Sequence, residues 1–223
     1  MAKLNVKSFF TLAVVLIVIV LCFISIGFRE GSRSKNKLLP ADVLVVYSYG
    51  SPSKTISEIK PEEADAITTA TPSDINVKTI AERIESEFKL KGYKTLLATP
   101  NEINNMRDLL QCKMLILGTG VRFWNMTWEM KRMIDIYFGK IYITSKNDFR
   151  KIAVGTFAQA EISASALAAI NALSAAASDC GSKPVASEVF LTSNNMPADT
   201  VMVRIKNFVA EMISGAANKS LND

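Results

Sequence analysis

The chain has 223 residues, a formal net charge of +5 and no histidine. This length suits one domain of ordinary size with a short additional segment. The absence of histidine excludes Ser-His-Asp and Cys-His catalysis. The three cysteines are isolated in the sequence, so neither a disulfide framework nor a zinc-binding spacing is present. The charge is spread along the chain without a block of like sign, so we expect no nucleic-acid partner.

The N-terminal part of the chain contains an uncharged apolar run from Ser8 to Phe28. A helix needs roughly 20 apolar residues to cross a bilayer, so this run predicts one transmembrane helix within residues 1–30, with membrane lipid as its partner. Basic residues lie on both sides of the run, with more of them after it. The positive-inside rule weighs these flanks and favours a single-pass protein of the cell membrane with a cytoplasmic domain. A cleaved signal peptide, with Ser25 and Gly27 before the cut, is the alternative.

The rest of the chain alternates short apolar runs with amphipathic helical patterns. A polar linker (31–40) precedes a domain (41–216) with a Pro-rich, charged insertion at about 52–72, and a tail (217–223) follows. The expected strands are residues 42–48, 93–98, 113–117, 151–157 and 184–191, and the expected helices are 76–90, 101–110, 125–138, 162–180 and 197–214.

Five alternations of strand and helix predict an α/β domain. Parallel strands joined by right-handed helical crossovers give a doubly wound five-stranded parallel sheet with helices on both faces. Ligands of such sheets bind at the carboxyl ends of the strands, near the point where the strand order reverses.

The sharpest functional signal is the segment Gly118–Asp135, which reads GTGVRFWNMTWEMKRMID. A strand that ends in a Gly/Thr turn leads into an aromatic loop. The loop's backbone groups and the rings of Phe123, Trp124 and Trp128 suit a planar heterocycle. Asn125 is placed to cap the next helix. A capped helix with a packed aromatic corner would give the same pattern, so the residues alone leave both interpretations open.

This segment resembles the flavin-ring loop of the flavodoxin-like NAD(P)H:quinone oxidoreductases and NADPH-dependent FMN reductases. The residues that match are Gly118, Thr119, Arg122, Phe123, Asn125, Met126, Thr127, Met130, Lys131, Ile134 and Asp135. The chain departs from the family pattern at Gly120, where proline is usual, and at Trp124, where glycine is usual. The resemblance implies the flavodoxin-like fold and an FMN ring held by Thr119, Gly120, Arg122, Phe123, Trp124, Asn125 and Met126.

In this family the FMN phosphate is held between the first strand and the first helix. Ser48 and Tyr49 begin the corresponding loop, and Asn76 and Val77 resemble the family's helix start, with Ser73 shortly before them. The insertion separates these two halves, and the resemblance leaves open which half binds phosphate or whether they meet. An ordinary turn followed by a helix N-cap is the alternative.

The loop after the fourth expected strand begins with Thr156 and Phe157. In the family, this loop contacts the edge of the flavin ring, although the glycines usual there are absent here. Glu161 suits the start of the next helix, where its charge would favour the helix dipole.

The resemblance therefore implies a membrane-anchored oxidoreductase that binds FMN and uses NAD(P)H as co-substrate to reduce a quinone or similar acceptor. In this interpretation the cofactor does the chemistry, so we assign no catalytic side chain and no metal. Two alternatives remain open: a flavodoxin-type electron-transfer module for a redox partner protein in the membrane, and a flavin-free binding domain of the same fold. A homo-oligomer also remains open.

Overall fold

The computed structural model describes residues 40–49, 76–192 and 197–221. These residues belong to one compact unit, Lys37–Asp223. The predicted anchor, nearly all of the linker and the insertion lie outside the described residues. None of the helices in the described part of the chain is long and apolar enough to cross a membrane.

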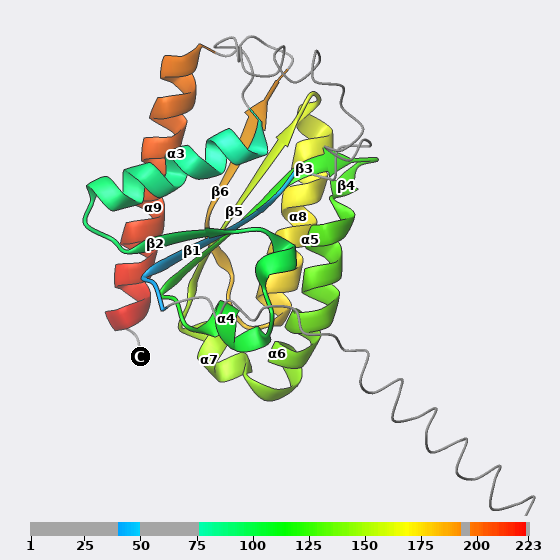
Figure 1. The fold of residues 1–223 in the computed structure, drawn as a ribbon, viewed down its shortest axis with the longest axis vertical. Coiled ribbons are helices and arrows are strands. Elements are labelled where there is room, and N and C mark those ends of the chain that lie inside the picture. The colour runs from blue at the N-terminus through cyan, green and yellow to red at the C-terminus, as the bar shows by residue number, and fades with distance from the viewer. Residues whose placement is uncertain (1–39, 50–75, 193–196, 222–223) are drawn as a thin grey trace, which may run out of the picture. The chain divides into compact units, whose positions relative to one another are not determined.

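Five strands form the parallel sheet that the sequence predicts. They are β1 (Val43–Ser48), β2 (Thr95–Ala98), β3 (Met114–Arg122), β5 (Ala153–Ala160) and β6 (Pro184–Leu191). Their order is β2-β1-β3-β5-β6, and every neighbouring pair is parallel. The chain thus starts inside the sheet, adds β2 on one side and then crosses to the other side, so the order reverses between β1 and β3 (Figure 1).

Helices cover both faces of the sheet (Figure 1). One face packs against α3 (Val77–Leu90) and α9 (Ala198–Leu221), and the other packs against α5 (Trp128–Met133) and α8 (Ser163–Asp179). Alternate residues of β1 enter the two cores, because successive side chains of a strand point to opposite faces. All six β1 residues are therefore buried.

Helix α3 forms where the apolar periodicity predicts it. The side chain of Asn76 accepts a hydrogen bond from the backbone N–H of Thr79 at 2.9 Å, which caps the helix. Ile80, Ile84 and Phe88 recur at helical spacing and are fully buried against the sheet.

The helix predicted over residues 101–110 is wrong in detail. The chain forms a 3-10 turn, η2 (Pro100–Glu102), and then a separate helix, α4 (Met106–Leu110). The carboxylate of Asp108 accepts hydrogen bonds from the backbone N–H groups of Asn104 and Asn105, at 2.9 and 3.1 Å. These bonds turn the backbone out of a continuous helix and start a new one.

The helix predicted from Asn125 also begins elsewhere. Strand β3 continues to Arg122 and folds back through a sixth, short strand, β4 (Asn125–Met126), which pairs antiparallel with it. Helix α5 therefore begins at Trp128, and Thr127 rather than Asn125 caps it. A π-helical turn, η3 (Ile134–Phe138), and two short helices, α6 (Gly139–Thr144) and α7 (Lys146–Arg150), lead on to β5.

Helix α9 extends beyond its predicted end at Ser214, so residues 217–221 of the predicted tail are helical. The ammonium group of Lys219 donates hydrogen bonds to the carbonyl of Ile152 at 2.8 Å and to the hydroxyl of Ser182 at 2.6 Å. It also donates to the carbonyl of Arg150 at 3.1 Å. These bonds hold the last helical turns against the amino ends of β5 and β6.

Candidate functional site

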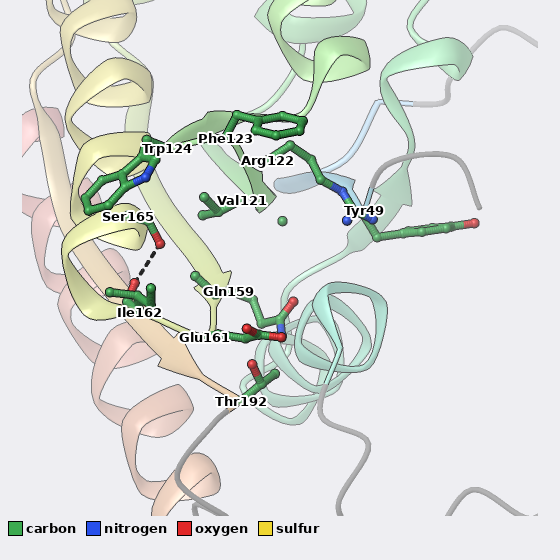
Figure 2. Close-up of a pocket in the computed structure, with 12 residues that line it drawn as sticks. Tyr49, Val121, Arg122, Phe123, Trp124, Gln159, Glu161, Ile162, Ser165 and Thr192 are labelled. Atoms are coloured by element: carbon green, nitrogen blue, oxygen red, sulfur yellow. Dashed lines mark hydrogen bonds between the residues drawn. The ribbon is translucent and has the colours of Figure 1, made fainter. Parts of the chain in front are cut away.

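A cleft of about 620 Å³ opens at the carboxyl edge of the sheet (Figure 2). Its walls come from the ends of four strands: Tyr49 follows β1, 120–124 belong to the β3 hairpin, 159–160 end β5 and are followed by 161–162, and Thr192 follows β6. Helix α8 adds Ser165. Small-molecule sites have volumes of roughly 300–1,000 Å³. Both the size and the position of this cleft are therefore those of a ligand site in a doubly wound sheet.

The β3–β4 hairpin forms one wall of the cleft. Arg122 pairs with Asn125, which leaves Phe123 and Trp124 as a two-residue loop. Both loop residues have positive φ, 46° and 64°, and they are the non-glycine residues in the described ranges with this conformation. Such loops prefer glycine or asparagine, because a β-carbon is crowded in left-handed backbone. The backbone at Trp124 therefore has a conformation that glycine would adopt without crowding.

The side chains of this hairpin diverge (Figure 2). The guanidinium of Arg122 extends toward Tyr49, and the Phe123 ring stands fully exposed at the rim. Trp124 turns away toward Ser165, with 60% of its surface exposed. Because Trp124 does not enter the space between the walls, the cleft stays open for a flat ligand.

Tyr49 provides an aromatic surface at the side of the cleft nearest β1. Its ring stacks on that of Tyr47, with centroids 6.3 Å apart and an angle of 24° between the planes. Tyr47 is buried, and burial raises the pKa of its phenol. The buried ring of Tyr47 thus lies next to the exposed ring of Tyr49 and supports it.

The opposite wall carries several polar side chains. Gln159 and Glu161 come from the end of β5, and Thr192 lies beside them (Figure 2). Arg122 and Glu161 thus place opposite charges on opposite walls. The sequence assigned no site role to Gln159 or Thr192, although both lie at carboxyl ends of expected strands, where ligands of this fold class bind.

A chain of buried hydroxyl groups ties the hairpin to the end of β1. The Thr127 hydroxyl donates to the hydroxyl of Ser48 at 2.7 Å, and Ser48 donates to the carboxylate of Glu129 at 3.5 Å. The backbone N–H of Thr127 donates to the Thr119 hydroxyl at 3.0 Å, which in turn donates to the carbonyl of Gly120 at 2.8 Å. The sequence predicts that Ser48 and Thr119 bind the cofactor. In the structure both residues bond to Thr127 and thereby hold the β3–β4 hairpin, which forms one wall of the cleft.

Three other sequence-predicted residues lie in the core rather than in the cleft. Met126 packs between the sheet and α5. Thr156 shares a hydrogen bond of 2.8 Å with Ser187. The fully buried Phe157 ring fills the space over Gly118. Strand β5 runs three residues past its predicted end, so its last residues, rather than Thr156 and Phe157, reach the site.

The start of α3 lies beside the cleft. A methyl group added to Gly120 would lie 3.5 Å from the side chain of Val77 and 3.5 Å from the carbonyl of Tyr49. The structure thus brings Val77, Gly120 and Tyr49 together, and Asn76 caps the same helix. The side chain of Asn125 accepts a hydrogen bond from the next backbone N–H, and it does not line the cleft. Ser73 lies outside the described residues.

No protein-family model matches the sequence, and no curated protein matches it. Solved structures do match. The rubredoxin oxygen:oxidoreductase of Desulfovibrio gigas has a TM-score of 0.56 at 12% identity over 81% of this chain. The match covers 37% of that longer protein. A flavodoxin of Streptococcus pneumonia has a TM-score of 0.51 at 11% identity, with 77% of this chain and 98% of that chain covered.

An NADH:FMN oxidoreductase has a TM-score of 0.52 at 16% identity, with 77% of this chain and 89% of that chain covered. The chain has the flavodoxin-like fold. At these identities the likeness is one of fold alone. In this flavodoxin-like domain the cleft occupies the place where the strand order reverses, as the sequence predicts.

Proposed function

We propose that this flavodoxin-like domain binds FMN in the cleft and acts as a membrane-anchored oxidoreductase, which uses NAD(P)H to reduce a quinone or similar acceptor. One observation carries the proposal. An open cleft lies at the reversal of strand order, with aromatic surfaces and a guanidinium on one side and polar groups on the other. Solved structures of the same fold include a flavodoxin and an NADH:FMN oxidoreductase, which supports a flavin as the ligand.

The residues of the cleft suit the isoalloxazine ring. That ring is flat and carries hydrogen-bonding groups along one edge. Tyr49 and Phe123 offer aromatic surfaces for stacking. The guanidinium of Arg122 supplies several donors, and the amide of Gln159 supplies both a donor and an acceptor. The divergence of Trp124 leaves the intervening space open.

The phosphate group is assigned to the start of α3. A helix N-terminus favours anions because its first N–H groups point outward and its dipole is positive there. Helix α3 has 14 residues and no acidic side chain in its first turn. Its first residue, Val77, lies beside Gly120 and Tyr49, so this helix start borders the cleft.

In this proposal the protein binds and orients, and the cofactor carries out the electron transfer. When bound, FMN would supply the hydride- and electron-transfer chemistry between a reduced pyridine nucleotide and the acceptor. The guanidinium of Arg122, which lines the cleft, would stabilise negative charge on the bound cofactor or acceptor. The buried hydroxyl chain beneath would hold the Arg122 wall in place.

FMN titration of the purified full-length chain in detergent tests the proposal. We expect quenching of flavin fluorescence on binding, a yellow protein, and NADH or NADPH oxidation when a quinone is added. A colourless protein that takes up no FMN would contradict the proposal. FMN uptake without pyridine-nucleotide oxidation would instead favour the electron-transfer module.

A matched pair of arginine variants tests the site. Arg122→Ala should weaken FMN binding roughly 10- to 100-fold, as expected for loss of a charged hydrogen bond. Arg107→Ala serves as the control, because Arg107 is exposed on α4, which precedes the amino end of β3. Equal affinities for the two variants would remove Arg122 from the site.

A further inference from the structure

Three large aromatic side chains are exposed within six residues of the chain. Phe123 is 100% exposed, Trp124 is 60% exposed and Trp128 is 64% exposed. We call these three residues the aromatic tip. Trp124 and Trp128 are also the two tryptophans of the whole chain. Large exposed apolar side chains this close together in the chain favour a site of interaction.

The backbone of the aromatic tip is strained, although its side chains are exposed. Phe123 and Trp124 both adopt left-handed φ values, which cost about 1–2 kcal/mol for each residue that carries a β-carbon. Phe123 recovers none of this cost by burial within the domain, because its side chain is fully exposed. Because no packing within the domain offsets this strain, we attribute it to a function of the exposed side chains.

The charge around the tip suits an anionic surface. The segment Arg122–Arg132 contains three cationic residues, and its one acidic residue, Glu129, is buried. Lys131 forms an ion pair with Asp135 at 2.9 Å, so Arg122 and Arg132 carry the positive charge of the segment. The guanidinium of Arg132 lies 5.4 Å from the ring centre of Trp128. Tryptophan next to arginine is the composition that proteins place at the membrane–water interface.

The predicted tether is long enough to bring the tip to a bilayer. The 14 residues from Arg29 to Asp42 join the apolar run to β1, and a chain of this length can span up to about 50 Å. The eight residues of β5 span about 26 Å. The tether is thus longer than the sheet is deep, so its length permits the carboxyl edge to face the bilayer that the proposed anchor would enter.

We infer that the aromatic tip inserts into the interfacial layer of a phospholipid bilayer that contains anionic lipid. This inference rests on the membrane anchoring in the proposed function. It places the mouth of the cleft at the membrane surface, so that an apolar acceptor enters the cleft directly from the lipid.

Tryptophan fluorescence tests the inference, because both tryptophans of the chain belong to the tip. The full-length chain is reconstituted into vesicles of phosphatidylcholine and phosphatidylglycerol, with lipids brominated at a shallow or a deep position. We expect stronger quenching by the shallow bromines, since interfacial side chains lie about 5–10 Å inside the headgroup boundary. The variants Trp124→Phe and Trp128→Phe report each tryptophan separately.

Flotation and flavin uptake by the same vesicles separate the possible failures. Vesicle-bound protein whose fluorescence is equal with brominated and unbrominated lipid overturns tip insertion and leaves anchoring and FMN binding intact. A tip that serves a protein partner instead gives this result. A chain that does not float with the vesicles overturns both the anchor and the inference.

A charge variant tests the role of the cations. Arg132→Ala should weaken insertion about five-fold in vesicles that contain phosphatidylglycerol, as expected for one cation at an anionic surface. Arg107→Ala is the matched control and should leave the quenching unchanged. An Arg132→Ala variant as strongly quenched as the control would overturn the electrostatic part of the inference.

Discussion

Replacing Phe123 by asparagine should stabilise the domain, although it removes a large apolar side chain. The Phe123 side chain is fully exposed, so the substitution loses no buried apolar surface. Its φ of 46° lies in the left-handed region, where asparagine is several-fold enriched over other residues that carry a β-carbon. That enrichment corresponds to roughly 0.5–1 kcal/mol in favour of the variant.

Thermal unfolding of the full-length chain in detergent, followed by far-ultraviolet circular dichroism, measures this gain. A domain of this size shifts its midpoint by about 2–4 °C for each kcal/mol, so we expect a rise of about 1–4 °C. Phe123→Ala is the control, since alanine keeps a β-carbon at the same φ and should gain nothing.

Two results would refute this reasoning. If Phe123→Ala gained as much as Phe123→Asn, the gain would come from removing exposed apolar surface and not from the backbone. If the asparagine variant were less stable than the parent chain, the phenyl ring would have a packing role in the folded protein. Phe123→Asn should also weaken insertion of the aromatic tip into vesicles. This result would show that the phenylalanine lowers the stability of the domain but improves membrane binding.

Three further predictions concern the core and the edges of the sheet. Gly118→Ala should destabilise the domain by about 1–3 kcal/mol in a urea titration, because the added methyl group would overlap the buried Phe157 ring. Gly139→Ala is the control, because Gly139 lies in helical backbone with open space around it, and it should be neutral or stabilising in the same titration. Lys219→Met should cost about 1–3 kcal/mol by removing the hydrogen bonds that its ammonium group donates. Amide exchange in the last turns of α9 should become faster, whereas Lys206→Met, at an exposed position, should change neither. Burial raises the pKa of the Cys112 thiol from 9.0 to about 12. The unfolded chain therefore loses this proton at lower pH than the folded domain, and the free energy of unfolding should fall as the pH rises from 9 to 12. The urea midpoints of Cys112→Ala should fall less over the same range.

The parallel strands could be predicted because they are buried on both faces. Such strands read as continuous apolar runs, as in residues 43–46 and 114–117, and the structure places both runs in the sheet. Helix α3 could be predicted because its cap and its apolar periodicity agree. In both cases the local sequence carries the information that decides the structure.

The hairpin could not be predicted, because the sequence lacks the usual signal for it. A two-residue loop is normally indicated by asparagine or glycine, and this loop is Phe123-Trp124. The end of β5 was placed too early, because the Ala-Gln-Ala that follows Phe157 is only weakly apolar. The hydrogen bond between Ser48 and Thr127 joins residues 79 positions apart, so only the folded sheet brings them together.

The contacts of Lys219 affect which substitutions this protein can tolerate as it evolves. They secure the amino rim of the sheet, whereas the cleft occupies the carboxyl rim. Substitutions that alter ligand preference can therefore accumulate at one rim while the other preserves the architecture. An engineer could likewise reinforce the amino rim first and then redesign the pocket with a wider margin against unfolding.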